Sequence, residues 1–577
     1  DYTMTLSRPP HYVDKMPDGF TSYDAYDAMN YQYMAASFDG AGWLPSTHTD
    51  PEQALQAEVQ AMIDPIRHAL EKDPDFFCGQ IIFQKDGYNM AKRTPVAFAL
   101  GQQLALLQEY GYQVVSVGEL LAESPFADVG REEPLFDRLT ALAEQRAIVF
   151  SDNRLRLDDP RVPEALKTRL RVQTELAYEI LRAYPYTQAQ MLEILKSHVK
   201  DFEEEELETL RDDGTLDWRY VNGEVRFKNN ALSGLLKTRA EYAARATDPE
   251  VKNGAKESAR QLHEIIAKMK ANGGVHARFE LHEQLTIRSD RLTPGETLRV
   301  HLPMPIVGAQ VKSAALLGAS HPVAFLAPED EPQRTIYFEL PYQPGMTVSA
   351  DVAYEIDAPY QQPHARDVYA EQPVFDTEEQ PPHVVFTPYL RALAKEIVGD
   401  ETNALLKARK IYDFITTQAV YRFMPPYLTV TNIPEYFLSG LRGDCGVQAI
   451  TFVTLCRLCG VPAQWQSGLY TKPDSAGHHD WARFYVAPFG WLFADCSFGG
   501  SAYRAGDLDR WNFYFGNLEP WRMPTCSAFQ QEFNPPRRFL RYDPYDNQSG
   551  DVESLTRRLY ADEYEHDCRV LRYEEME

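Results

Sequence analysis

The chain is 577 residues long and carries 58 Lys and Arg against 84 Asp and Glu, a formal net charge of −26. At roughly 150 residues per domain, this length predicts about four structural units. The composition, 44% hydrophobic and 12% aromatic, excludes a disordered or fibrous protein. The acidic balance argues against nucleic-acid binding, which depends on basic surface. The sequence contains no run of about 18 apolar residues, so it predicts no transmembrane helix.

The seven cysteines are too few and too unevenly spaced for a disulfide framework. We therefore expect reduced thiols. They slightly favour an intracellular compartment, with the cell envelope as the alternative, so the sequence leaves the location open. We predict no cofactor and no metal ion.

Residues 1–122 are predicted to form an α/β region, because helical patterns over 51–71 and 94–110 alternate with short apolar runs. Within this region, residues 106–121 resemble the last strand and helix of polysaccharide deacetylase barrels. The metal-binding Asp and His motifs of those enzymes are missing here, so we predict no such activity.

Residues 123–185 resemble a degenerate S-layer homology module. The resemblance rests on Phe126-Ala127-Asp128-Val129, on an apolar helix near Leu139 and on Asp152-Asn153 in a turn. It would imply binding to a cell-wall peptide or glycan. The threonine-arginine signature that closes such modules is blurred to Lys167-Thr168-Arg169, and we favour a small helical domain of structural role.

The remaining chain divides by its hydrophobic period. Residues 186–274 are predicted as a charged helical segment, in which the acidic run 203–206 is a solvated helix face. Period-two stretches over 275–357 predict an antiparallel β-sandwich. Residues 358–383 are predicted as a linker, and a last domain with an extension as 384–577. In this domain Thr387-Pro388 predicts the start of a helix that Gly399 ends, and a second helix is predicted from about Asn403 to Val420. The expected fold class is multidomain α+β.

The last domain contains a cysteine in a special position. Gly443-Asp444-Cys445-Gly446 precedes an apolar helix that ends near Gly460-Val461-Pro462. Cys445 is thus predicted in the first turn, where free N–H groups and the helix dipole favour a thiolate. We expect a lowered pKa for its thiol.

A histidine and a carboxylate follow on two predicted strands, 479–486 and 491–496, separated by a turn at Pro488-Phe489-Gly490, whereas 472–477 reads as a loop. Ala487 is midway between His479 and Asp495, so a hairpin at this turn would bring their side chains together. Thiol, imidazole and carboxylate are the parts that nucleophilic acyl transfer requires.

Four motifs in this order resemble the transglutaminase-like core of the papain-type thiol enzymes: residues 443–445, 460–463, 479–481 and 491–495. The resemblance covers about 386–500, and a preceding β-sandwich is usual in bacterial members. It implies a papain-like catalytic domain with Cys445 as nucleophile, His479 as base and acid, and Asp495 orienting His479.

The oxyanion site departs from this family. The Gln of papain-type enzymes and the Trp of animal transglutaminases are missing before Cys445, so Tyr436, Gln448 or the backbone N–H of Cys445 are the candidates. Trp481 is a cleft candidate among five clustered tryptophans, for which we favour an aromatic core over a substrate cleft. Cys456 and Cys459 read as core residues rather than a zinc half-site.

Residues 512–517 and 541–548 are expected to wrap the cleft, and Asp543, Asp546 and Asn547 to form a turn rather than a calcium site. The sequence thus predicts a cysteine-dependent acyl-transfer enzyme that hydrolyses amide or peptide bonds, or transfers them to an amine, with a peptide or protein substrate. The alternative is a non-catalytic binding or scaffold protein that keeps this fold, associated with the cell wall.

Overall fold

The computed structural model describes residues 46–74, 76–77, 95–112, 162–541 and 545–576. It also gives five two-residue strands: β1 (Leu6–Ser7), β2 (Gln32–Tyr33), β3 (Phe38–Asp39), β4 (Ile82–Phe83) and β5 (Ala147–Ile148). The chain divides into two compact units. One comprises Asp1–Phe150 with Arg219–Val225, and the other Ser151–Trp218 with Arg226–Glu577.

The first unit contains the two predicted helices. Helix α2 (Pro51–Lys72) begins where the Asp50 side chain accepts hydrogen bonds from two backbone N–H groups, and α3 is Pro95–Glu109. Met62, Ile63 and Ile66 of α2 share a core with α3. The two helical predictions are confirmed. The part of the deacetylase-like segment that follows Tyr112 lies outside the described residues.

Helices predominate over residues 162–272, with three short strands among them. Of the predicted S-layer module, the part up to residue 161 lies outside the described residues, except for β5. Most of the rest of the module forms α7. The acidic run forms the first turn of α9, where carboxylates complement the helix dipole. The bounds are α7 (Glu164–Ala183), β6 (Tyr186–Thr187), α8 (Gln188–His198), α9 (Glu204–Asp212), β7 (Trp218–Val221), β8 (Glu224–Phe227), α10 (Ala231–Thr238), α11 (Ala240–Arg245) and α12 (Pro249–Asn272).

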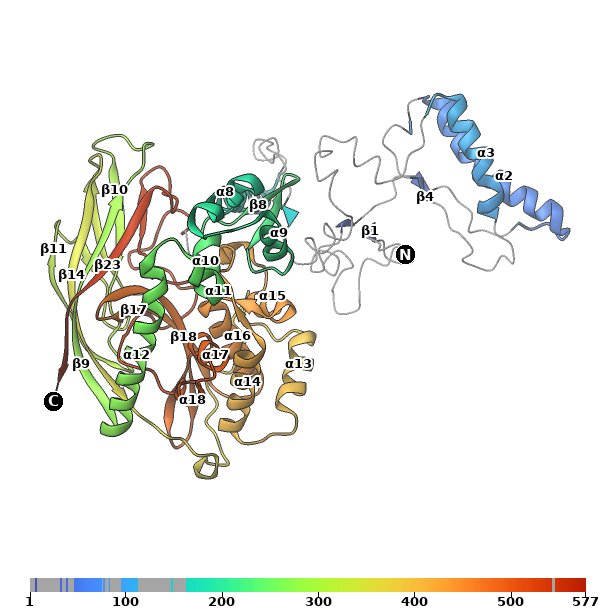
Figure 1. The fold of residues 1–577 in the computed structure, drawn as a ribbon. Helices are drawn as coiled ribbons and strands as arrows, with labels where there is room; N and C mark the ends of the chain where they lie inside the picture. The colour runs from blue at the N-terminus through green and yellow to red at the C-terminus, as the bar shows by residue number, and fades with distance from the viewer. Residues whose placement is uncertain are drawn as a thin grey trace. The chain divides into compact units, whose positions relative to one another are not determined.

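Two four-stranded antiparallel sheets follow α12 (Figure 1). Their orders are β12-β13-β10-β22 and β11-β14-β9-β23. Every second residue of β9 is buried, which explains its period-two pattern. The bounds are β9 (Gly274–Ile287), β10 (Thr297–Pro303), β11 (Val311–Ala319), β12 (Phe325–Leu326), β13 (Thr335–Pro341), β14 (Thr347–Pro359), β22 (Asp551–Ser554) and β23 (Tyr564–Met576).

Two of these strands come from much later in the chain. Strand β23 pairs with β9 from Tyr564 opposite Ile287 to Met576 opposite His276, and β22 pairs with β10. The sequence analysis had placed these residues in the extension of the last domain. The segment 527–576 therefore joins the sheets as well as the region around the predicted site.

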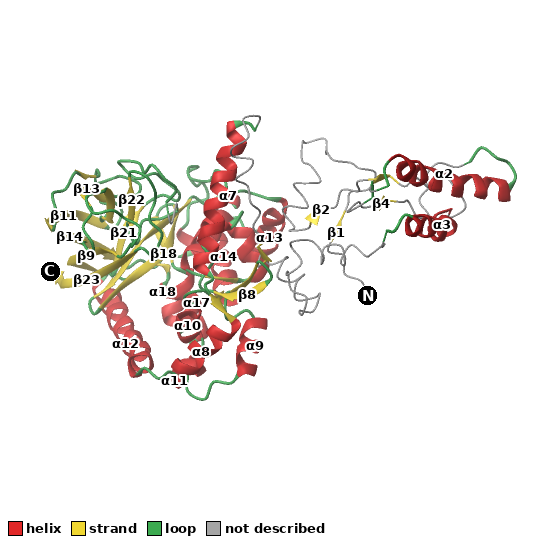
Figure 2. Ribbon diagram, turned by 90° about the horizontal axis from the view of Figure 1, so that it is seen from above, coloured by secondary structure: helices red, strands yellow, loops and turns green. Residues whose placement is uncertain are grey.

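Helices and short strands of residues 365–458 form the next part, which Figure 2 shows apart from the two sheets. Thr387 caps α13, Gly399 ends it with φ +63, and Asn403 caps α14, so both helix predictions are confirmed. The bounds are η2 (Ala365–Asp367), α13 (Pro388–Val398), α14 (Ala404–Gln418), β15 (Val420–Tyr421), η3 (Tyr427–Thr429), α15 (Ile433–Gly440), β16 (Arg442–Gly443) and α16 (Cys445–Leu458).

A five-stranded antiparallel sheet of order β20-β19-β18-β17-β21 lies against α16. The predicted loop 472–477 is wrong: β17 and β18 extend over it and leave a turn of two residues, Pro473 and Asp474. The long pairing with β17 explains this, because each added pair satisfies backbone groups. The bounds are β17 (Ala463–Lys472), β18 (Ser475–Val486), β19 (Gly490–Ala494), α17 (Cys496–Arg504), α18 (Leu508–Phe513), β20 (Phe515–Gly516) and β21 (Arg522–Cys526).

One hydrophobic core runs through the sheets and the helices of residues 262–564. Phe279 of β9, Phe452 of α16 and Phe484 of β18 belong to it and are fully buried. The site described below therefore rests on rigid, packed elements. None of the helices in the described part of the chain is both long and apolar enough to cross a membrane.

Candidate functional site

Cys445 is the first residue of α16, as predicted. Asp444 caps this helix by accepting the Val447 N–H at 3.2 Å, and it also accepts the Tyr427 hydroxyl. The α16 residues Gly446 to Cys456 are buried, so Cys445 lies at the N-terminus of a helix that is packed along most of its length. Cys445 as a whole residue keeps some exposure to solvent. A nucleophile in this place has free backbone N–H groups beside it.

His479 and Asp495 meet as the hairpin argument predicted. The hairpin pairs Ala482 with Ala494, which puts Asp495 one position beyond β19 and diagonally across from His479. His479 Nε2 lies 2.7 Å from Asp495 Oδ2, and both side chains are buried. Since Asp495 is ionised, Nε2 carries the proton and donates it. Nδ1 is then the nitrogen that can accept a proton.

Asp495 belongs to a buried network of charges that the sequence analysis missed. Arg522 of β21 donates from Nη1 to Asp495 Oδ2 at 2.8 Å and from Nε to Glu519 Oε1 at 2.8 Å. Burial alone would raise the pKa of Asp495, but His479 and Arg522 outweigh it and hold that pKa well below its usual range. Burial lowers the pKa of His479, which is therefore neutral at pH 7.

The Cys445 thiol is engaged by a different carboxylate. Cys445 donates from Sγ to Asp480 Oδ2 at 3.2 Å, whereas the contact of His479 is with Asp495. Successive strand residues point to opposite faces, which separates His479 from Asp480. Burial, then Asp480 and Asp444, raise the pKa of the Cys445 thiol well above its ordinary value. The expected lowering of this pKa is wrong, because burial and the two carboxylates raise it.

The three oxyanion and cleft candidates are engaged inside the protein. Gln448 donates to the Gly443 carbonyl at 2.9 Å, and Trp481 donates from Nε1 to Gln466 Oε1 at 2.9 Å. Trp481 is fully buried, as an aromatic core requires. The Tyr436 hydroxyl accepts a long bond of 3.4 Å from Arg422. The backbone N–H of Cys445 remains the donor nearest to the nucleophile.

The 527–576 segment contributes a glutamine to the site. Gln548 donates from Nε2 to the His479 carbonyl at 3.1 Å and to Asp480 Oδ1 at 3.0 Å. This agrees with the expectation that residues 541–548 approach the site. Asp480 had a sequence signal, because it stands between His479 and Trp481 in the matched motif. Gln548 and Arg522 had none, since each reaches the site only through the tertiary fold.

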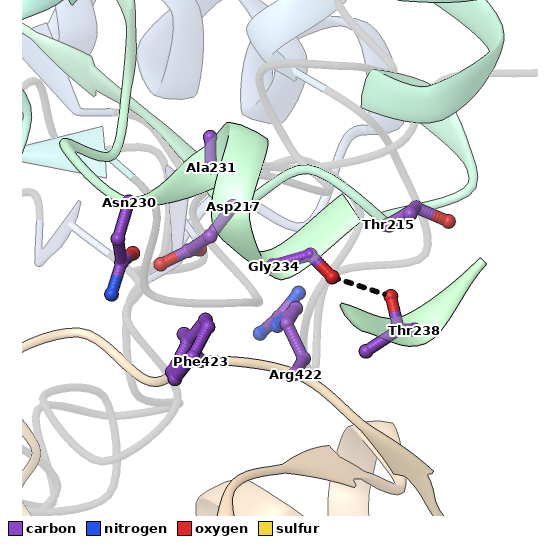
Figure 3. A pocket seen from close by; sticks show the side chains of 8 residues that line it. All are labelled: Thr215, Asp217, Asn230, Ala231, Gly234, Thr238, Arg422 and Phe423. Atoms are coloured by element: carbon purple, nitrogen blue, oxygen red, sulfur yellow. Dashed lines mark hydrogen bonds between the residues drawn. The ribbon is translucent and has the colours of Figure 1, made fainter. Parts of the chain in front are cut away.

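A small hollow lies where α10 faces the residues that follow β15. Figure 3 shows Asp217, Arg422 and Phe423 around it. A Cβ atom at Gly234 of α10 would lie 3.2 Å from the Phe423 ring, so the helix approaches this ring closely. Next to the hollow, Lys237 donates to the Tyr421 hydroxyl at 3.3 Å. These contacts hold α10 against the strand that leads to the site.

Within the described residues, no group of three His, Cys, Asp or Glu side chains is placed to hold a metal ion. Asp543 of the predicted turn lies outside them. Asn547 donates to the Arg334 carbonyl at 2.7 Å and so serves the fold.

Residues 391–496 match the family model of the transglutaminase-like superfamily. The match covers less than half of the chain, and it identifies this domain as transglutaminase-like. It contains Cys445, His479 and Asp495, whereas Arg522 and Gln548 lie beyond it. No curated protein matches the chain.

Several solved structures are similar to this chain. A proposed cysteine protease of Cytophaga hutchinsonii is 14% identical with a TM-score of 0.34, over 52% of this chain and 91% of that one. The periplasmic domain of TgpA from Pseudomonas aeruginosa is 14% identical with a TM-score of 0.21, over 43% and 96%. A proposed protease of Parabacteroides distasonis is 12% identical with a TM-score of 0.18, over 36% and 42%. The S-layer and deacetylase resemblances of the N-terminal residues stay predictions.

Proposed function

We propose that the protein is a cysteine-dependent acyl-transfer enzyme that cleaves an amide bond in a peptide or protein. Cys445 is the nucleophile, His479 the general base and acid, and Asp495 the residue that orients His479. The 2.7 Å contact of His479 Nε2 with Asp495 Oδ2 carries the proposal. The family match over the same residues supports it.

The reaction takes place in two transfers. His479 accepts the Cys445 proton at Nδ1 while the sulfur attacks the substrate carbonyl carbon. The C–N bond then breaks, and Nδ1 returns the proton to the leaving amine, which leaves a thioester on Cys445. Water next gives a proton to His479 and attacks the thioester, the C–S bond breaks, and the proton goes back to sulfur. An amine in place of water would give transamidation.

The surrounding residues suit these steps. Neutral His479 can accept a proton, and the ionised Asp495 stabilises the imidazolium that results. Arg522 keeps Asp495 ionised throughout, because its fixed charge lies 2.8 Å away. Negative charge on the substrate oxygen can be stabilised by the N–H groups that begin α16, above all that of Cys445.

The experiment that tests this function is a screen of peptide pools for new amino termini or released ammonia. It compares the wild type with Cys445→Ala and with Cys459→Ala, a cysteine at the other end of α16. We expect cleavage by the wild type and Cys459→Ala, and a thioester or alkylated adduct on Cys445 by mass spectrometry. Cleavage that persists in Cys445→Ala would remove Cys445 as the nucleophile.

One observation favours a second candidate, a binding protein without catalysis. The Cys445 thiol bonds to Asp480 rather than to His479. In a binding protein, peptides found by capture on immobilised protein would bind wild type and Cys445→Ala equally and would be released intact. Release of shortened peptides by the wild type alone would decide against it.

A further inference from the structure

The Asp480 carboxylate connects the proposed nucleophile to the 527–576 segment. Its Oδ2 accepts the Cys445 thiol at 3.2 Å, and its Oδ1 accepts Gln548 Nε2 at 3.0 Å. The side chain is 5% exposed, so water does little to screen these contacts. Each oxygen thus has a defined partner, and the carboxylate plane is fixed.

Gln548 is itself held firmly. Its amide also donates to the His479 carbonyl, at 3.1 Å, so it fixes the backbone and the side chain of two successive residues. Before it, Asn547 donates to the Arg334 carbonyl, and after it, Gly550 adopts φ +66 against the His301 carbonyl. A glutamine anchored on both sides can hold a carboxylate in one orientation.

The charges around Cys445 are mostly negative. They are the charges of Asp480 on β18, Asp444 at the cap of α16 and Lys237 on α10. Tyr421 of β15 and Tyr427 of η3 also face Cys445, but burial raises the pKa of both hydroxyls well above the ordinary value, so they are neutral at pH 7. Lys237 favours the thiolate, but the two carboxylates and the burial outweigh it. Gly446 brings the helix so close to Asp480 that a Cβ atom there would lie 2.9 Å from Oδ2. The carboxylate therefore faces the thiol across a tight contact.

We propose that Asp480, oriented by Gln548, is a positioning residue that holds the resting Cys445 as a neutral thiol. This inference rests on the proposed function for the role of Cys445 as nucleophile. The hydrogen bond stabilises the protonated sulfur, and the nearby negative charge destabilises the thiolate. The enzyme therefore rests in a form of low thiol reactivity, which protects it from alkylation and oxidation.

The rate of Cys445 alkylation as a function of pH tests this role, with peptide assignment by mass spectrometry. In Asp480→Asn, which keeps the shape and removes the charge, we expect the midpoint to fall by about one to three pH units. Thermal melting of the same sample checks that the variant is folded. A midpoint equal to or above that of the wild type would overturn the proposal, since Asp480 would then favour the thiolate.

Gln548→Leu tests the second half of the proposal. Without the amide donor, Asp480 loses its fixed orientation, and we expect a smaller fall of the midpoint in the same direction. Gln531→Leu is the matched control, because Gln531 lies in the same 527–576 segment and donates to the Phe529 carbonyl, away from Cys445. An unchanged midpoint in Gln548→Leu, or an equal fall in Gln531→Leu, would remove Gln548 from the proposal.

The experiments distinguish a failure of the positioning role from a failure of the proposed function. If Asp480→Asn lowers the midpoint but the wild type cleaves no peptide, the positioning role stands and the enzyme reading fails. If the wild type cleaves peptides and the midpoint does not fall, the enzyme reading stands and the positioning role fails. Alkylation of Asp480→Asn at pH 6 that depends on His479 would support both.

Discussion

Arg522 donates to Asp495 Oδ2, the same oxygen that receives His479 Nε2, at 2.8 Å and 2.7 Å. One carboxylate oxygen therefore joins a permanent cation to an imidazole, and the second oxygen, Oδ1, accepts the Phe498 N–H and the Ser497 hydroxyl. Each carboxylate oxygen of Asp495 thus accepts two hydrogen bonds. Its carboxylate cannot rotate, so the orientation of His479 is set before any substrate binds.

Arg522→Met should destabilise the protein strongly. The substitution leaves Asp495 and Glu519 buried without their cation, and loss of one partner of a buried ion pair costs about 3–5 kcal/mol. Denaturant unfolding at pH 7 measures the free energy of unfolding. The double variant Arg522→Met with Glu519→Gln should recover part of the loss. If it is no more stable than the single variant, Glu519 does not contribute in this way.

Asp495→Asn should reduce catalysis more than stability. An amide keeps the size of the carboxylate but no longer stabilises the imidazolium, and it loosens the choice of ring tautomer in His479. We expect kcat/KM on a peptide found in the screen to fall roughly 10²–10⁴-fold. Asp551→Asn, a buried carboxylate in β22, is the comparison for a purely structural loss. Equal activity in wild type and Asp495→Asn would exclude the orienting role.

His383 should make the protein sensitive to acid. Burial lowers its pKa to about 4. The neutral ring accepts the Ile433 N–H at Nδ1 and contacts the Tyr545 hydroxyl through Nε2. Its contribution to stability is complete above the unfolded pKa near 6.5 and is lost as the pH falls towards about 4. The total is about 3 kcal/mol.

The check on His383 is the free energy of unfolding measured from pH 7 to pH 4. His383→Gln should show a shallower decline than the wild type over this range, because glutamine takes up no proton. Parallel curves for the two proteins would show that His383 is not the group that titrates.

Gly446→Ala should disturb the site directly. A Cβ atom at this position would lie 2.4 Å from the Tyr427 hydroxyl and 2.9 Å from Asp480 Oδ2, so the neighbours must move. We expect a loss of about 1–3 kcal/mol in unfolding free energy. Gly440→Ala, in open space at the end of α15, is the control and should be tolerated. Equal stability of the two variants would contradict the close contact.

Local signals in the sequence predicted the parts of the site that neighbouring residues determine. Thr387, Gly399 and Asn403 mark helix ends by their own side chains or φ angles, and the structure has these ends where expected. The symmetry of a hairpin about its turn was enough to bring His479 and Asp495 together. Such features depend on short stretches of chain.

The remaining features depend on contacts between distant segments. Arg522 reaches Asp495 because β21 pairs with β17, a pairing that leaves no local pattern. The pKa of Cys445 depends on how deeply its side chain is packed and on the carboxylates of Asp480 and Asp444 beside it. The pairing of β22 and β23 with the two sheets was not predicted, because it too leaves no local pattern in the sequence.

The pairing of β23 with β9 also determines how long β9 waits for this partner strand during synthesis. Tyr564 lies opposite Ile287, so a ribosome that adds about 5–20 residues per second needs roughly 15–55 s to supply the partner strand. During this interval, one edge of β9 has unsatisfied hydrogen-bonding groups, and Asp480 has not yet met Gln548. Nascent chains of this length are thus exposed to edge-to-edge association until residues 548–576 emerge, and a chaperone that covers β9 would act in that window.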